Sequence, residues 1–455
     1  MLSPVRPPFS REFPADFLWG CATSSYQIEG GTADGGRGES IWDRFCRQPG
    51  AIRDGSSGEP ACDHYHRWEE DLDLAAALGV RAYRFSIAWP RIFPNGIGSR
   101  PNPEGLAFYS RLVDGMLKRG LQPWATLYHW DLPQALQERG GWLNRSTIGA
   151  FSDFARVMGD QLGDRVQHWI THNEPWCTAM LGHHLGVHAP GLRDFRAAMQ
   201  VSHHLLVSHG EAVRALRSAA PSAKVGITLS LHPIRPASNR PADLAAAVRH
   251  DGLRNRWFLD PLFGKGYPDD VLSALGEEAP RIVDGDLCRI ASPCDFLGVN
   301  YYFPETVADA PEGGALRTQV IESGDGPHTA MGWPVDAQGM VELLERVQRD
   351  YAPPALYLTE NGACYEDVMG QDGRVTDLQR QRFLADHIAA AHQALRVGVP
   401  LKGYFVWSLL DNFEWAEGYG KRFGLVHVDY ATQQRRLKAS GEWLRSFLRT
   451  ERVMS

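Results

Sequence analysis

The sequence predicts an α/β protein whose strands close into a (β/α)8 barrel. Eight short apolar runs, rich in β-branched and aromatic residues, recur along the chain, and amphipathic segments of helical length lie between them. No low-complexity linker and no change of composition divides the 455 residues. We therefore expect residues 1–455 to form a single domain, although the length alone would allow about three.

The expected strands are residues 17–23, 82–87, 123–128, 166–171, 225–229, 295–300, 356–359 and 403–407. The expected helices are residues 68–78, 104–119, 148–162, 197–218 and 378–396. In the first of these helices the apolar residues Leu72, Ala75 and Leu78 share one face, and Gly79 provides a C-cap. Alternating strands and helices imply parallel strands joined by right-handed crossovers, and eight such strands close a barrel. A doubly wound open sheet gives the same local pattern, so it stays an alternative here.

Polar and aromatic residues follow the expected strands directly. Active sites of barrels lie at the carboxyl ends of the strands, so these residues are expected on one rim. They comprise residues 24–30, 89–91, 129–131, 173–175, 301–302, 360–362 and 411–415.

Two glutamates on this rim are the candidate catalytic residues. Glu174 follows the fourth expected strand, and Glu360 follows the seventh. Cleavage of a glycosidic bond needs an acid that protonates the leaving oxygen and a carboxylate that attacks or stabilises the anomeric carbon. The gap between the two carboxyl groups decides between retention and inversion, and the spacing in the sequence leaves both open.

Other side chains on the rim suit a sugar. Aromatic faces stack on the C–H surface of a sugar, and amide, imidazole and carboxyl groups bond its hydroxyls. The aromatic candidates are Trp130, Trp407, Trp415 and Tyr302, and the polar candidates are Gln27, His129, Asn173 and Glu414.

Composition excludes several other classes of function. The net charge is −7 and the basic residues are scattered, so no nucleic-acid partner is expected. The first thirteen residues hold no apolar run of signal-peptide length, and no later stretch could span a membrane, so a cytoplasmic location is expected. The 7 cysteines lie far apart without a CxxC pair, as expected of reduced thiols. Neighbouring histidines lack metal-ligand spacing, and no phosphate-loop motif occurs, so neither metal nor cofactor is expected.

Eight motifs in order resemble glycoside hydrolase family 1, the β-glucosidase family, over nearly the whole chain. They are FLWG at 17–20, YQIEG at 26–30, YRFSIAWPR at 83–91, LYHWDLP at 127–133, NEP at 173–175, NYY at 300–302, TENG at 359–362 and WSLLDNFEW at 407–415.

This resemblance implies a retaining mechanism in one catalytic (β/α)8 domain, with Glu174 as acid/base and Glu360 as nucleophile. It also implies that Arg84, Asn300 and Tyr302 surround the nucleophile. The residues implied to hold the nonreducing sugar are Gln27, His129, Asn173, Glu414 and Trp415, with Trp407 as the platform beneath it. Arg84 is expected to keep Glu360 ionised while Glu174 holds a proton.

The expected substrate is a small β-glycoside or cello-oligosaccharide, which suits a part in cellulose degradation. Glu414 stands where relatives acting on 6-phosphorylated sugars have a small residue, so an unphosphorylated sugar is expected. A transglycosylase or a non-catalytic sugar-binding relative is the alternative on the same scaffold, and an oligomer is left open. Three positions depart from the pattern of many relatives, namely Ser230 in place of Asn, His183 in place of Tyr, and Pro334 in place of an acid.

Overall fold

The computed structural model describes residues 13–98, 100–322, 324 and 326–449. Residues 1–12 lie outside the described part. The expectation about a signal peptide concerns this segment. Within the described part, none of the helices is both long and apolar enough to cross a bilayer.

Eight parallel strands form a closed barrel in the order β1-β2-β3-β4-β5-β7-β10-β11, and β11 pairs back with β1. The barrel is confirmed, and the open sheet is excluded. Every expected strand is present with ends shifted by at most a few residues. The strands are β1 (Leu18–Ala22), β2 (Ala82–Ser86), β3 (Gln122–Tyr128), β4 (His168–Asn173), β5 (Lys224–Ser230), β7 (Phe296–Asn300), β10 (Leu356–Asn361) and β11 (Leu401–Trp407).

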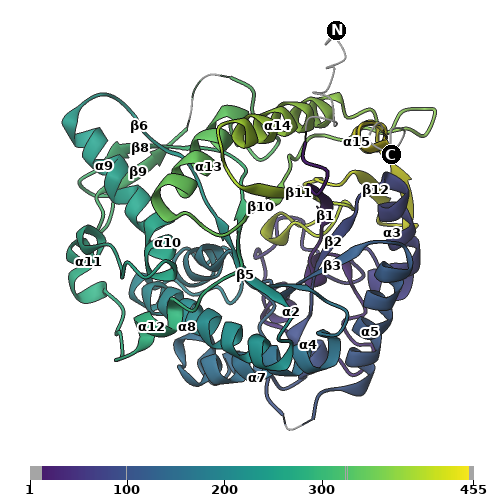
Figure 1. Ribbon diagram of the computed structural model, residues 1–455, viewed down its shortest axis with the longest axis horizontal. Coiled ribbons are helices and arrows are strands. Elements are labelled where there is room, and N and C mark those ends of the chain that lie inside the picture. The colour runs from purple at the N-terminus through teal and green to yellow at the C-terminus, as the bar shows by residue number, and fades with distance from the viewer. Residues whose placement is uncertain (1–12, 99, 323, 325, 450–455) are drawn as a thin grey trace.

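Long helices surround the barrel, as Figure 1 shows. The five helices named from the sequence are confirmed, and α13 and α15 are two further long helices. Local sequence sets their ends: Asn102 caps the start of α5, Asp194 caps α8, and Gly79 ends α3 with a φ of 93°. The long helices are α3 (His64–Leu78), α5 (Pro103–Lys118), α7 (Ser146–Leu162), α8 (Phe195–Ala219), α13 (Ala337–Tyr351), α14 (Leu378–Arg396) and α15 (Ala439–Arg449).

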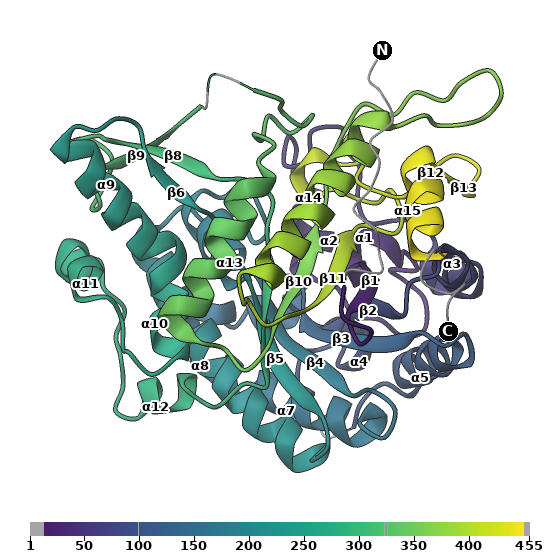
Figure 2. The ribbon, with the colours of Figure 1, turned by 45° about the horizontal axis from the view of Figure 1, so that its top comes forward.

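Shorter elements extend the loops that follow the strands. A sheet of β6 (Ile234–Pro236), β8 (Glu305–Asp309) and β9 (Thr318–Ile321) lies beside α9 (Pro241–Asp251), and β12 (Val426–Asp429) pairs with β13 (Gln434–Leu437) near α15 (Figure 2). The chain is π-helical over Cys177–His184 and Gly252–Arg256. The remaining short helices are α1 (Ser25–Ile28), α2 (Ile41–Phe45), α4 (Trp89–Ile92), α6 (Gln134–Gln137), α10 (Trp257–Leu262), α11 (Asp269–Leu275) and α12 (Asp286–Ile290).

Side chains fill the barrel in layers. Near the amino ends of the strands, the centroid of the Trp124 ring lies 5.2 Å from the ring centroid of Phe296, 4.7 Å from that of Tyr357 and 5.0 Å from that of Phe405. Gly20 is required here, because a Cβ atom at this position would lie 2.3 Å from the ring of Phe405. This aromatic layer closes the bottom of the barrel, so ligands can enter only from the carboxyl ends of the strands.

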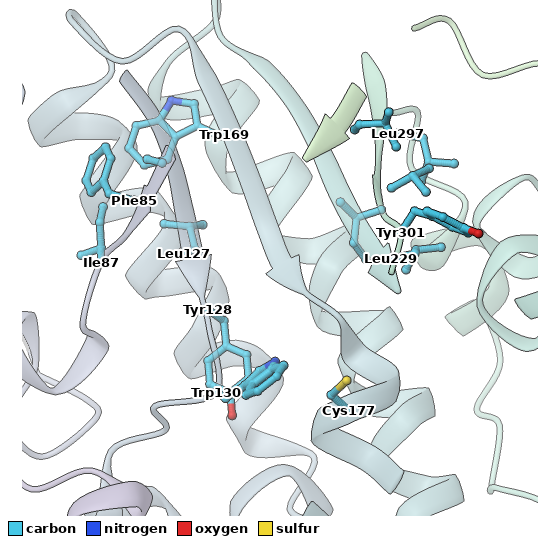
Figure 3. Close-up of a cluster of buried hydrophobic side chains, with 14 of the residues drawn as sticks. Phe85, Ile87, Leu127, Tyr128, Trp130, Trp169, Cys177, Leu229, Leu297 and Tyr301 are labelled. Atoms are coloured by element: carbon cyan, nitrogen blue, oxygen red, sulfur yellow. The ribbon is translucent and has the colours of Figure 1, made fainter. Parts of the chain in front are cut away.

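The outward side chains of the same strands pack against the helices. Phe85 on β2, Leu127 on β3 and Trp169 on β4 belong to the large core between barrel and helices, and Figure 3 shows them with Leu229 and Leu297. All five are buried. Alternate residues of each strand thus fill two separate cores, which is the pattern of a parallel barrel covered on its outside.

A buried ion-pair network fixes the loop after β11. The ammonium of Lys438 donates to Asp411 over 2.6 Å and also to Asp367, and Arg422 donates to Asp411 over 2.7 Å. The side chains of Lys438, Asp367 and Asp411 are fully buried. Because Asp411 begins the segment that carries Glu414, this network connects the C-terminal hairpin to the predicted site.

Replacing Lys438 with methionine should lower the free energy of unfolding by about 3–5 kcal/mol, because two buried carboxylates lose a partner. Urea unfolding followed by tryptophan fluorescence measures this loss. Lys402→Met is the matched control, since this lysine is half-exposed and lies 4.0 Å from Asp16; it should change the free energy by no more than about 0.5 kcal/mol. Equal midpoints for the two variants would contradict a stabilising role of the network.

Candidate active site

A cavity of about 500 Å³ opens at the carboxyl ends of the strands. It is the catalytic cavity of the following text. The predicted site residues that line it are His129, Trp130, Glu174, Tyr302, Glu360, Trp407, Glu414 and Trp415. The other four predicted residues, Gln27, Arg84, Asn173 and Asn300, are buried and are not among its lining residues. The strand ends thus bring the predicted residues together, as the barrel required.

Glu174 directly follows the last residue of β4. The strand begins two residues later than expected and extends through Asn173, so the glutamate stands at the rim with a positive φ of 48°. Positive φ is unfavourable for a residue with a Cβ atom and persists only where the surroundings enforce it. The carboxylate accepts a hydrogen bond of 2.9 Å from Asn300 Nδ2, and it is 6% exposed.

Glu360 lies on β10, where two donors bind its carboxylate. Arg84 Nη1 donates to Oε1 over 2.6 Å, and the hydroxyl of Tyr302 donates to Oε2 over 2.7 Å. Arg84 Nη1 also donates to the carbonyl of Thr359, and Arg84 Nε donates to Thr126 Oγ1. The donors orient the carboxylate and satisfy its two oxygens.

A short chain of hydrogen bonds connects the two glutamates. Arg84 Nη2 donates to Asn173 Oδ1 over 2.6 Å, and Asn300 Nδ2 donates to the same oxygen over 3.1 Å. Asn300 in turn binds Glu174, while Arg84 binds Glu360. Both carboxylates are therefore positioned by the same buried polar layer above the aromatic bottom of the barrel.

Burial and neighbouring carboxyl groups raise the pKa values of Glu360 and Glu414. Burial raises the pKa of Glu360 to about 7, against the opposing effect of Arg84 and with a further raising effect from Glu174. Burial, Glu360 and Glu174 raise the pKa of Glu414 to about 8. Arg84 thus lowers the pKa of Glu360, as expected, but burial outweighs it, so that the carboxyl group titrates near neutrality.

The remaining polar groups offer hydrogen bonds to a ligand. Asn173 Nδ2 lies 3.1 Å from His129 Nε2, and its oxygen is occupied by Arg84 and Asn300, so Nδ2 donates and His129 carries its proton on Nδ1. That Nδ1 and the Oε2 of Glu414 are buried and have no hydrogen-bond partner among the residues that the structure describes. Burial lowers the pKa of His129 well below its usual range, so the ring is neutral. Both atoms belong to residues that line the catalytic cavity.

Aromatic rings form further parts of the cavity wall. The ring of Trp415 lies 4.6 Å from Trp130, and the ring of Trp407 lies 5.9 Å from His129, nearly parallel to it. Trp130 and Trp415 have positive φ values of 77° and 50°. The Trp130 indole donates to the carbonyl of Asn173 over 2.9 Å, which holds this strained residue in place.

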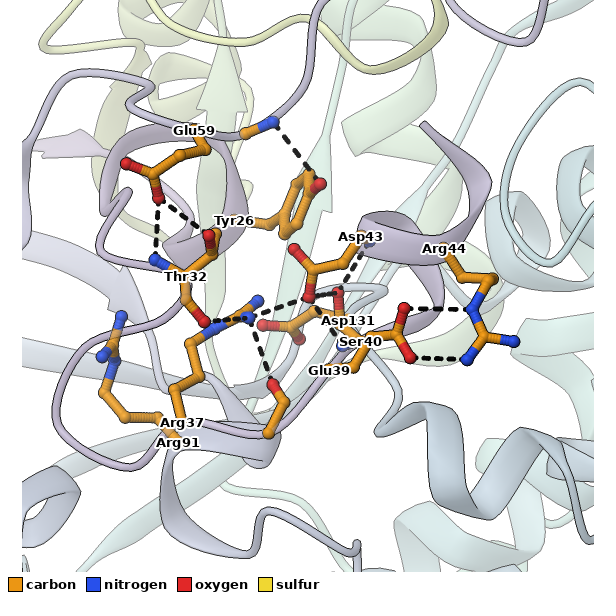
Figure 4. Close-up of polar contacts among 12 residues, drawn as sticks. Tyr26, Thr32, Arg37, Glu39, Ser40, Asp43, Arg44, Glu59, Arg91 and Asp131 are labelled. Atoms are coloured by element: carbon orange, nitrogen blue, oxygen red, sulfur yellow. Dashed lines mark hydrogen bonds and ion pairs between the residues drawn. The ribbon is translucent and has the colours of Figure 1, made fainter. Parts of the chain in front are cut away.

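Loops after β1 and β3 support this half of the site. Arg37 Nη1 donates to Asp43 and to the carbonyl of Thr32, and Ser40 and Asp43 form a capping box at the start of α2 (Figure 4). The backbone N–H of Ile41 donates to the carbonyl of Leu132. Asp131, next to Trp130, accepts from Ser25 over 2.7 Å. Gln27 lies on α1, the short helix that also carries Ser25. Its amide donates to Asn412 and to the carbonyl of Phe413.

The sequence did not predict the rest of the cavity lining. Trp176, Leu181, Val187, His188, Ser230, His232, Arg254, Phe303, Glu305, Met331, Trp333 and Phe423 also line the cavity. Proximity to a motif could have indicated Trp176 and Phe303, whereas Arg254 and Glu305 carry no signal in the sequence. Of the three departures, Ser230 lines the cavity, but His183 and Pro334 do not.

Comparison with known proteins agrees with this geometry. The model of glycosyl hydrolase family 1 matches residues 9–453. The chain belongs to this family.

Individual family 1 relatives match over almost their full lengths. Beta-glucosidase A of Thermotoga maritima is 48% identical over 95% of this chain and 97% of its own. The bifunctional beta-D-glucosidase/beta-D-fucosidase of Bifidobacterium breve is 44% identical over 96% of this chain and 98% of its own. The Thermotoga maritima beta-glucosidase in complex with glucoimidazole superimposes with a TM-score of 0.93 at 47% identity, covering 96% of this chain and 99% of that one. The resemblance drawn from the eight motifs is confirmed.

Removing the phenol of Tyr302 should shift the pH profile of this family 1 chain. The hydroxyl binds the charged form of Glu360, so Tyr302→Phe raises the pKa of that carboxyl group further. If hydrolysis requires the carboxylate, kcat/KM rises as pH increases through this pKa, and the acidic limb should move up by about one pH unit. The measurement is kcat/KM for 4-nitrophenyl β-D-glucoside between pH 4 and 9.

Tyr301→Phe is the matched control for that profile. Its hydroxyl donates to the carbonyl of Asp336 and makes no bond to Glu360. The acidic limb of this variant should coincide with that of the parent protein. An unshifted limb in Tyr302→Phe would show that the phenol does not stabilise the charge on Glu360.

Proposed function

We propose that the chain is a retaining β-glucosidase that hydrolyses terminal nonreducing β-D-glucosyl residues, with β-fucosides and β-galactosides as additional substrates. The observation that carries this is the pair Glu174 and Glu360 in one cavity, positioned by the Arg84–Asn173–Asn300 chain of hydrogen bonds. The names of the Thermotoga maritima and Bifidobacterium breve relatives support glucosides and fucosides.

In the first step Glu360 acts as the nucleophile. Its carboxylate attacks the anomeric carbon while the bond to the leaving oxygen breaks and Glu174 donates its proton to that oxygen. The products are a glycosyl ester on Glu360 and the free alcohol. Arg84 and Tyr302 bind the attacking carboxylate before reaction, so the reacting oxygen is held in place at little entropic cost.

In the second step water replaces the alcohol. Glu174, now charged, takes a proton from water, whose oxygen attacks the anomeric carbon and releases Glu360 as a carboxylate. Ester formation removes the charge of Glu360 from the cavity until the second step restores it. Two inversions give net retention.

Glu414 and His129 are proposed to form hydrogen bonds with the nonreducing sugar. With its pKa raised to about 8, Glu414 is mostly a neutral acid at pH 7 and can both donate and accept a hydrogen bond. The neutral His129 offers the unpaired Nδ1 proton. A 6-phosphate would bring two further negative charges beside three carboxyl groups, so an unphosphorylated sugar fits. Direct sugar contacts by Gln27, Arg84, Asn173 and Asn300 stay predictions.

Three statements about the cellular role and domain organisation also stay predictions. They are the cytoplasmic location, the part in cellulose degradation, and the organisation of residues 1–455 as one catalytic domain. The 7 cysteines are free thiols, which suits a reducing compartment. A non-catalytic sugar-binding role finds no support, because both carboxyl groups are present and oriented.

The two glutamates can be distinguished by the anomer that azide yields. Glu360→Ala should lose hydrolysis of 2,4-dinitrophenyl β-D-glucoside and regain turnover with sodium azide, giving the α-glucosyl azide by direct displacement. Glu174→Ala still forms the ester with this good leaving group, and azide then attacks the ester to give the β-glucosyl azide. On substrates with poor leaving groups Glu174→Ala should be slower by about 10²–10⁴-fold. Nuclear magnetic resonance identifies each product.

The same anomer from both variants would contradict the assignment of roles. Full activity of Glu360→Ala would contradict the proposed mechanism itself. Asp153→Ala serves as the control, because this carboxylate is exposed on α7 with only a weak ion pair to Arg156. It should hydrolyse the substrate like the parent protein.

A further inference from the structure

We propose that Thr359 is a positioning residue for Glu174, because its hydroxyl holds the amide of Asn300 in the orientation that binds this acid. This inference rests on the proposed function and extends it to a residue whose hydroxyl bonds Asn300 rather than either glutamate. Thr359 lies on β10 directly before Glu360, and Asn300 ends β7. Both side chains are fully buried.

The orientation of the Asn300 amide follows from the charge of Arg84. A guanidinium has only donors, so the Asn173 atom that Arg84 Nη2 meets at 2.6 Å is the oxygen. Asn300 therefore presents its nitrogen to that oxygen over 3.1 Å, and the same nitrogen donates to Glu174 Oε1 over 2.9 Å. An amide turned the other way would place its oxygen against two acceptors.

The oxygen of the same amide needs a donor of its own. The hydroxyl of Thr359 donates to Asn300 Oδ1 over 2.8 Å. Thr228, on β5, donates in turn to Thr359 Oγ1 over 3.2 Å, and its side chain is also fully buried. A buried amide oxygen that loses its only donor keeps the full cost of its desolvation. The Thr359 hydroxyl therefore stabilises the amide orientation that Arg84 requires.

A glycine leaves the space in which the two hydroxyls meet. In the barrel β7 lies between β5 and β10, and Gly298 on β7 pairs with Thr228. A Cβ atom at Gly298 would lie 2.4 Å from Thr228 Oγ1 and 2.8 Å from Thr359 Oγ1. Any side chain at this position would displace one of the hydroxyls, so three neighbouring strands are shaped around this contact.

Thr228 also supports the backbone of the acid. Its carbonyl accepts a hydrogen bond of 2.9 Å from the N–H of Glu174. One residue of β5 thus supports Glu174 twice, directly through the backbone and indirectly through the hydroxyl of Thr359 and the amide of Asn300. The strained conformation of Glu174 is held by these surroundings.

Loss of the Thr359 hydroxyl should weaken only the step that needs the acid. A poor leaving group departs only with a proton on its oxygen, whereas 2,4-dinitrophenolate leaves without one. Attack by Glu360 depends on Arg84 and Tyr302, which bind its carboxylate independently of this hydroxyl. A misplaced Glu174 therefore predicts a loss of activity that grows as the released phenol becomes less acidic.

The test measures kcat/KM for 2,4-dinitrophenyl, 4-nitrophenyl and phenyl β-D-glucosides. Thr359→Val keeps the shape of the side chain and removes the hydroxyl. We expect it to lower kcat/KM about tenfold for the phenyl glucoside but no more than about twofold for the 2,4-dinitrophenyl glucoside, so that the dependence on phenol acidity becomes steeper. Thr359→Ser restores the donor and should keep the slope of the parent protein.

Thr171→Val is the matched control for the series. Thr171 is a fully buried threonine of β4 whose hydroxyl lies 2.7 Å from His209 Nδ1, and it does not line the catalytic cavity. This variant loses a comparable buried hydrogen bond at a distance from Asn300. It should lose stability but keep the slope of the parent protein.

An unchanged slope in Thr359→Val would overturn the inference. An equal loss on all three substrates would also overturn it, because it would indicate general damage rather than a misplaced acid. A slope in Thr359→Ser as steep as that in Thr359→Val would assign the effect to shape instead of the hydroxyl and would overturn it as well. Failure of the proposed function is distinct: the parent protein would hydrolyse none of these glucosides, or Glu174→Ala would leave the slope unchanged.

Discussion

The buried guanidinium of Arg84 is the constraint on which the site depends. A cation at the centre of a barrel is tolerated only when its charge and its donors are satisfied. Here it binds Glu360 on β10, Asn173 on β4 and Thr126 on β3 from its own place on β2. A shift of any of these strands by one residue would turn its partner outward and leave the charge unpaired. The same contacts that define the register of the barrel thus hold the reacting carboxylate.

One cation among several carboxyl groups leaves the cavity rich in acid, and this has a cost in stability. The pKa values of Glu360 and Glu414 in the folded protein, about 7 and about 8, lie above the ordinary value of 4.5. Between these limits the folded state binds more protons than the unfolded chain, so the contribution of both groups to stability falls as pH rises from about 4.5 to 8.

The sequence predicted the barrel and the two glutamates at its rim but not the rest of the cavity lining, and the reason is physical. Barrel strands are continuous apolar runs. A polar residue directly after such a run, as Glu174 is after Asn173, therefore lies on the rim at the carboxyl ends of the strands. Arg254 and Glu305 meet through a π-helical segment and the pairing of β6 with β8, which are contacts distant in sequence.

The predictable and the unpredictable residues of the cavity also lie on different elements of the fold. Strand ends carry the proposed acid, the proposed nucleophile and the candidate sugar-binding residues, and their positions follow from the closure of the barrel. Elements outside the barrel carry other lining residues of the catalytic cavity, such as the stacked pair of Arg254 and Trp176. These residues contribute nothing to the register of the strands, so they can change without disturbing Arg84 or Glu360. Ser230, which departs from the asparagine of many relatives, stands at this boundary, because it ends β5 and accepts a hydrogen bond from Arg254.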